Sequence, residues 1–138
     1  MLVRPFVAVD LDGFEGMHQP NEAVLDQIDS NTLSIVERDT GQVLAIVGYN
    51  LWWEGVGSVW AHLSIDCKGK GIRFIRAVRR SIDIAFKKGN LRKMITMIFE
   101  SDHEAVRWSK PTGWTLEGIL EGASPDGSNL RLYSINRG

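Results

Sequence analysis

Cysteine is almost absent from the sequence, since Cys67 is the only one among 138 residues. A single cysteine excludes an intramolecular disulfide and any metal site built on several thiolates, and we expect no bound metal. Such cysteine usage fits a reducing compartment and predicts a cytoplasmic protein.

Long apolar runs are missing as well. No stretch approaches the roughly 18 uncharged apolar residues of a membrane-spanning helix. The first residues, Met1 to Phe6, lack a basic segment followed by an apolar one, so they do not resemble a secretion signal. We expect no membrane partner.

Neither sign of charge is in excess, because 16 Lys and Arg face 17 Asp and Glu. The whole protein therefore has no electrostatic attraction to nucleic acid, and a basic site must be local. Basic residues do surround the helix predicted below, which keeps nucleic-acid binding as a distant third hypothesis, although basic residues around a helix usually form its solvated face.

The remaining composition is that of one soluble domain over residues 1–138, with 43% hydrophobic residues and no repeat or linker. Tight turns make the strands before residue 65 antiparallel, whereas a helix between two strands implies a parallel βαβ crossover. We predict an α+β fold with a mixed, mostly antiparallel sheet of six or seven strands and flanking helices. The predicted strands cover 2–9, 32–38, 43–53, 58–65, 93–99, 114–121 and 130–135.

Three helices are predicted between these strands. A short one begins at Asn21 and ends near Ser30. A long one carries its apolar stripe from Ile72 to Phe86 and stops at Gly89-Asn90. The last is capped by Ser101 or Asp102 and is terminated by Pro111 and Gly113.

The most informative segment is the turn over residues 65–72, between a strand and the long helix. Gly69 and Gly71 allow a sharp bend that exposes successive N–H groups, and the helix adds the positive end of its dipole. Lys68, Lys70 and Arg73 add charge. These features predict a pyrophosphate site, although an ordinary strand-to-helix turn uses glycine for the same backbone reasons.

This turn follows antiparallel strands joined by tight turns, and the whole arrangement over roughly residues 32–135 resembles the GNAT acetyltransferase superfamily. The family motif R/Q-x-x-G-x-G/A falls on 66–71, where both glycines match and Asp66 takes the first position. A second family pattern, N-x-x-A-x-x-x-Y-x-K-x-G-F, falls on 102–114. There Ala105 and Gly113 match, and Ser109 stands at the tyrosine position.

The resemblance implies an N-acetyltransferase that moves an acetyl group from acetyl-CoA to an unidentified amine on a small molecule or a protein. It assigns His62 and Glu100 as candidate general bases and Ser109 to the place of the tyrosine that often protonates the CoA thiolate. A histidine hydrogen-bonded within the sheet and a surface carboxylate are the alternatives for the first two. The implied CoA contacts are Leu63, Ser64 and Ile65 for pantetheine, and Lys68, Gly69, Lys70, Gly71, Ile72 and Arg73 for the pyrophosphate.

A second hypothesis is a GNAT-fold protein that no longer catalyses and serves in assembly or interaction, for example in a tailed-phage head or virion. The serine at the tyrosine position, a phosphate loop about two residues short of the family's and five tryptophans motivate it. Such a protein would occupy a host cytoplasm or a virion and would bind an assembly partner or a second copy of itself.

Trp52 and Trp53 are predicted on opposite strand faces, one in the core and one at an interface. Cys67, beside a helix N-terminus, would have a lowered pKa if it were a nucleophile.

Overall fold

The computed structural model describes residues 1–16 and 24–138. Within them one mixed sheet has the strand order β1-β2-β3-β4-β5-β7-β6. The predicted fold class is confirmed. The strands are β1 (Leu2–Pro5), β2 (Leu33–Val36), β3 (Val43–Trp53), β4 (Val56–Leu63), β5 (Lys93–Phe99), β6 (Thr115–Leu120) and β7 (Leu130–Asn136); the helices are α2 (Gly71–Gly89) and α3 (His103–Ser109), with 3-10 turns η1 (Ala8–Leu11) and η2 (Ile65–Cys67).

The N-terminal part differs most from its prediction. The opening strand ends at Pro5 because proline has no N–H for the ladder, and the chain then turns into η1. Asp10 holds this turn by accepting a hydrogen bond from the N–H of Val7 at 2.9 Å. The predicted cap Asn21 lies outside the described residues, and Val24 and Leu25 are helical.

The helices α2 and α3 lie on one face of the sheet. Phe74 of α2 and Trp108 of α3 meet with ring centroids 5.5 Å apart, and Phe74 is buried against β2 and β3 residues. Asp102 caps α3 by accepting from the N–H of Ala105 at 3.2 Å. Asn90 ends α2 with a φ of 49°. The opposite sheet face is covered by a separate cluster that includes Phe14 and Val24.

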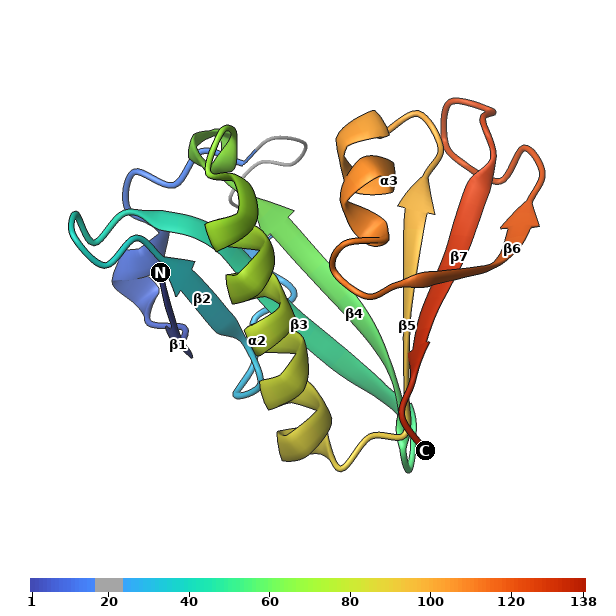
Figure 1. The fold of residues 1–138 in the computed structure, drawn as a ribbon, viewed down its shortest axis with the longest axis horizontal. Helices are drawn as coiled ribbons and strands as arrows, with labels where there is room; N and C mark the ends of the chain where they lie inside the picture. The colour runs from blue at the N-terminus through green and yellow to red at the C-terminus, as the bar shows by residue number, and fades with distance from the viewer. Residues whose placement is uncertain (17–23) are drawn as a thin grey trace.

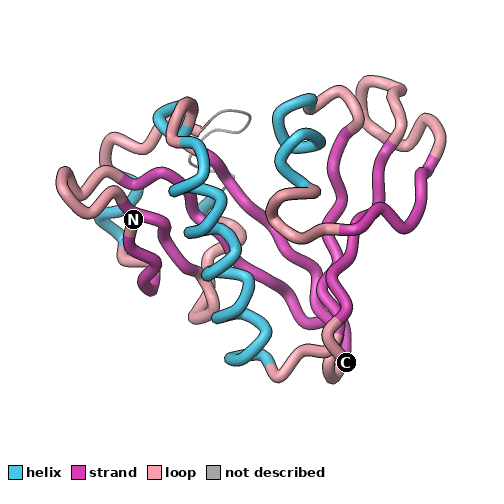
Figure 2. Tube along the Cα trace, viewed as in Figure 1, coloured by secondary structure: helices cyan, strands magenta, loops and turns pink. Residues whose placement is uncertain are grey.

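The sheet opens between β4 and β5, which is the feature that matters most for function. These strands pair in parallel at only three positions, of which Ser58 with Ile95 is the last. Figure 1 shows two arms, β1 to β4 and β5 to β7, that join near the C-terminus and diverge towards the other end. The same divergence is visible between the magenta strands of Figure 2.

Trp52 and Trp53 do not divide between core and surface as predicted. A register shift interrupts β3 between Leu51 and Trp53, so simple alternation fails at this point. The two side chains are 46% and 61% exposed, and their rings touch at 5.7 Å between centroids. Neither tryptophan belongs to the core.

Candidate functional site

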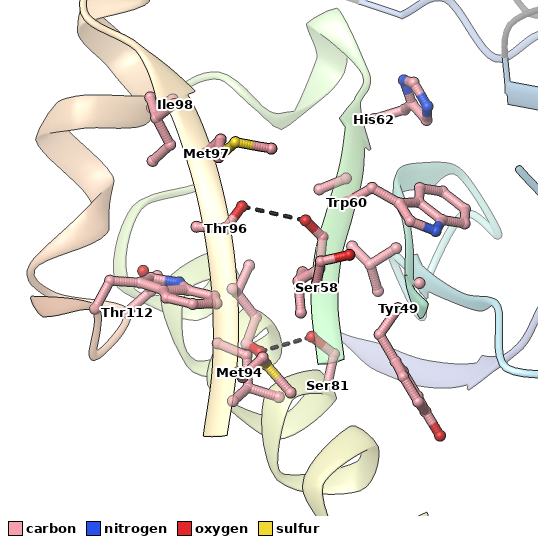
Figure 3. Close-up of a pocket in the computed structure, with 18 of the residues that line it drawn as sticks. Tyr49, Ser58, Trp60, His62, Ser81, Met94, Thr96, Met97, Ile98 and Thr112 are labelled. Carbon is pink, nitrogen blue, oxygen red and sulfur yellow. Dashed lines mark hydrogen bonds between the residues drawn. The ribbon is translucent and has the colours of Figure 1, made fainter. Parts of the chain in front are cut away.

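A cavity of about 770 Å³ occupies the space between the diverging strands, within the usual size of ligand sites. It reaches both faces of the sheet, since residues of α2 and α3 line it on one side and Trp60 and His62 line it on the other. Figure 3 shows Met97 on β5 across from Trp60 on β4. Among the described lining residues no lysine or arginine occurs, and Asp102 is the only acid.

The edge of β4 directs backbone groups into this cavity. At the point of divergence the Thr96 hydroxyl donates to the carbonyl of Val59 at 3.2 Å, so the backbone carbonyl of Val59 points towards β5 (Figure 3). Backbone groups of alternate residues point the same way, which places those of Ala61 and Leu63 towards the cavity. A ligand with amide groups can therefore pair with β4 as an added strand.

Of the three residues predicted to pair with pantetheine, only Leu63 presents its backbone to the cavity. The N–H of Ser64 donates to the carbonyl of Leu44 at 2.9 Å, and that of Ile65 donates to Glu15 at 3.0 Å. Both donors are thus used within the chain. Ala61, which precedes the predicted segment, is the better placed partner.

The glycine turn is open on its outer side. Gly69 and Gly71 have φ values of 78° and 60°, and a Cβ added to either would meet no atom within 4 Å. The N–H groups of Lys68 and Lys70 are used by carbonyls of the preceding 3-10 turn. Those of Gly69 and Gly71 have no backbone acceptor among the described residues. This turn has room and free donors for an anion.

The cations beside the turn are already paired with an acid. Glu37, a buried residue just after β2, accepts from Arg73 at 2.7 Å and lies 3.7 Å from the Lys70 ammonium. Burial alone would raise the pKa of Glu37, but these two cations outweigh it and hold that pKa below its ordinary value. A bound diphosphate would have to share these cations with Glu37.

His62 lies on β4 at the wide end of the cavity and is 8% exposed. Its Nε2 is hydrogen-bonded to the side-chain oxygen of Gln27, and its ring packs against Trp60 at 5.5 Å between centroids. With that oxygen as acceptor, Nε2 carries the proton and Nδ1 keeps its lone pair. Burial lowers the pKa of His62, so the imidazole is neutral near pH 7.

The other two catalytic candidates are placed differently. Ser109 lines the cavity, and its hydroxyl donates to the carbonyl of Val106 at 2.7 Å. Glu100 is not among the lining residues; one of its carboxylate oxygens lies 3.6 Å from Arg131. The structure brings His62 and Ser109 to one cavity and leaves Glu100 outside it.

Burial disfavours the thiolate form of Cys67. The side chain is 1% exposed, and burial, reinforced by the charge of Glu104, raises its pKa to about 11. The helix N-terminus does not offset this desolvation, so the lowered pKa considered from the sequence is wrong.

Cations of α2 tie the helix to neighbouring segments, in addition to the pairing of Arg73. These hydrogen bonds join Arg79 to the Pro111 carbonyl at 3.1 Å, Arg80 to that of Met1 at 3.4 Å and Lys88 to that of Ser30 at 2.7 Å. These four basic residues thus bind neighbouring segments of the chain, as long side chains on a solvated helix face can.

Several cavity residues were not singled out from the sequence. Trp60 stands two positions before His62 and so shares its strand face, a signal that the period of two could have supplied. Gln27 and Met97 carried no comparable signal, because only the fold brings their elements to this cavity.

The fold is that of the GNAT acyl-CoA N-acyltransferases. An acetyltransferase of the GNAT family from Bacillus anthracis superposes with a TM-score of 0.78 at 13% identity, covering 98% of this chain and 93% of the other. A candidate phosphinothricin N-acetyltransferase gives 0.72 at 15% identity, with 99% and 98% covered. A variant of spermidine N-acetyltransferase from Vibrio cholerae gives 0.73 at 12% identity, with 99% and 95% covered.

At the level of sequence there is no corresponding match: no protein-family model and no curated protein matches this chain. Identities this low establish the architecture and leave function to the residues of the site.

Among the described residues, neither α2 nor α3 has both the length and the apolar character needed to cross a lipid bilayer. The same residues include no group of three or more metal-ligating side chains that could hold an ion.

Proposed function

We propose that this chain is an N-acetyltransferase that moves an acetyl group from acetyl-CoA to a primary amine in the cytoplasm. The observation that carries the proposal is the joint geometry of the cleft and the turn. A cavity whose described lining has no lysine or arginine and a single carboxylate runs along free β4 backbone groups between the diverging strands, and an unobstructed turn with Gly69 and Gly71 follows the end of β4.

The parts of acetyl-CoA have matching places in this arrangement. The diphosphate would accept from the N–H groups of Gly69, Gly71 and the first turn of α2, with Lys70 and Arg73 adding charge. The amides of pantetheine would pair with Ala61 and Leu63 along β4. The thioester would then lie in the cavity.

The reaction needs positioning and one proton acceptor. The amine nitrogen attacks the thioester carbonyl carbon, a C–N bond forms, the C–S bond breaks and the sulfur leaves as a thiolate. An amine that enters as an ammonium loses two protons: neutral His62 is the base we assign to the first, and the second leaves the nitrogen as the C–S bond breaks. The thiolate takes up one of these protons through solvent to give CoA, because the Ser109 hydroxyl is a much weaker acid than a thiol and already donates to the carbonyl of Val106.

A calorimetric titration of the protein with acetyl-CoA and with CoA tests the proposal. Binding with micromolar affinity to one site per chain, followed by acetylation of a primary amine detected by mass, is the expected result. Absence of binding at millimolar ligand would refute it.

A second function is supported by the exposed tryptophan pair. Both side chains, Trp52 and Trp53, are exposed to solvent. Large aromatic side chains on a surface are enriched at interfaces. A GNAT-fold protein that binds an assembly partner or its own copy, for example in a phage particle, would use them. Loss of a copurifying partner, or of a dimer measured by light scattering, in Trp53→Ala would favour this function, whereas a monomeric protein that acetylates amines would refute it.

A further inference from the structure

The cavity has two unlike halves, and the one facing away from α2 is not needed by the proposed cofactor. Val59 and Leu63 of β4 pack into the clusters on the α2 face. Trp60 and His62 lie at the alternate positions of the same strand, so their side chains point to the opposite face. Trp60 indeed packs against the cluster that covers that face.

The strand across the cavity adds apolar side chains to the same half. Met94 is buried with α2 residues, so Met97 and Phe99, at the opposite parity of β5, face away from α2. They are 54% and 46% exposed, and both line the cavity. Among the described residues this half is thus an aromatic and thioether surface that remains open to a second ligand.

Charge is scarce among the described residues that line the cavity, which limits what the second ligand can be. The one carboxylate among the described lining residues, Asp102, is used as the cap of α3. His62 is neutral near pH 7 because burial lowers its pKa. A ligand with several ammonium groups would leave most of them without a counter-charge, which is costly in a partly dry site. A single ammonium can be held by the face of Trp60 and loses its charge when it reacts.

We infer that the acceptor is a primary amine with one positive charge and an apolar, preferably aromatic, body that packs on Trp60, Met97 and Phe99. This inference rests on the proposed function, because it assigns the α2 face of the cavity to acetyl-CoA and the other face to the amine. It separates this chain from spermidine acetylation, the activity named for the Vibrio cholerae structure of the same fold.

The test is a binding experiment that needs no turnover. The indole N–H signal of Trp60, identified by its loss in Trp60→Phe, is followed by NMR while 2-phenylethylamine, ethanolamine or spermidine is added in the presence of CoA. We expect 2-phenylethylamine to shift this signal and to bind about 10-fold or more tightly than either other amine, from burial of its ring. Spermidine binding as tightly as 2-phenylethylamine, or no shift of the Trp60 signal with 2-phenylethylamine, would overturn the inference.

A variant pair sharpens the result. Met97→Glu places a carboxylate on the cavity wall and should weaken 2-phenylethylamine while it tightens spermidine. Ile119→Glu adds the same charge to β6 at a site that is 47% exposed and is not among the lining residues, so it should change neither. Calorimetry with acetyl-CoA and no amine tests the proposed function separately, so either idea can fail alone. Equal effects of both substitutions would contradict the assigned acceptor site.

Discussion

Replacing Gly69 with alanine separates the structural role of the turn from its proposed role in binding acetyl-CoA, because the chain contains a matched control. Gly69 has a φ of 78° and Gly41, in the β2–β3 hairpin, has a φ of 74°. A Cβ at either position would meet no atom within 4 Å. Gly69→Ala and Gly41→Ala therefore impose the same backbone strain without a clash.

The expected loss of stability is small and equal in the two variants. Holding alanine in the left-handed region costs about 1–2 kcal/mol. The reduced freedom of the unfolded chain returns about 0.4–1 kcal/mol of this. The net destabilisation is about 1 kcal/mol, which lowers the melting temperature of a chain of this size by about 4 °C.

The two variants should differ in ligand binding. The methyl group of Gly69→Ala projects into the open space in front of the turn, where the proposed diphosphate approaches the free N–H groups. We expect acetyl-CoA to bind Gly69→Ala about 10-fold or more weakly, and Gly41→Ala to bind it like the unaltered protein. Calorimetry measures both affinities, and a melting curve of each variant confirms equal folding. Equal affinities in the two variants would refute the assignment of the diphosphate to this turn.

Three further predictions concern residues around the cavity. Glu37→Gln frees two cations beside the turn, so acetyl-CoA should bind several-fold more tightly in calorimetry; weaker binding would mean that Glu37 instead holds these cations in place. Burial lowers the pKa of His62 below its ordinary 6.5, so below about pH 6.5 the unfolded chain binds more protons than the folded protein and the free energy of unfolding should fall as the pH falls. Denaturation curves of His62→Gln at several pH values should lack this loss. The same pH dependence in His62→Gln as in the unaltered protein would contradict the assignment to His62. A Cβ at Gly48 would lie 2.4 Å from the ring of Trp60, so Gly48→Ala should cost about 1–3 kcal/mol in urea unfolding; Gly118→Ala, in a strand with nothing within 4 Å of the Cβ, is the control, and similar costs in both would show that the ring is not the cause.

Local patterns predicted much of the fold. The bounds predicted for the strands Val43–Trp53 and Lys93–Phe99 agree with β3 and β5, because both runs are rich in β-formers and end at turn residues. The apolar stripe from Ile72 and the stop at Asn90 located α2 in the same way. A helix between two strands then required the parallel pair that the sheet contains.

The site was less accessible to such reasoning, because its contacts join distant parts of the chain. Glu37 meets Arg73, 36 positions later, and His62 meets Gln27, 35 positions earlier. No local period encodes either pair. Trp52 shows the reverse problem, since alternation applies only until a bulge shifts the register of β3.

Charge along the cleft favours one kind of ligand for the proposed reaction. The cations, including Lys70 and Arg73, lie beside the turn at the end of β4, whereas the described lining of the cavity has neither lysine nor arginine. A free nucleotide would satisfy the turn and leave the cavity empty, and an apolar amine would fill part of the cavity and leave the turn unused. A long molecule with a diphosphate at one end and an uncharged amide chain at the other satisfies both, and acetyl-CoA is such a molecule. Because each half contributes separately, weakening the turn should reduce cofactor affinity without closing the acceptor half of the cavity to its amine.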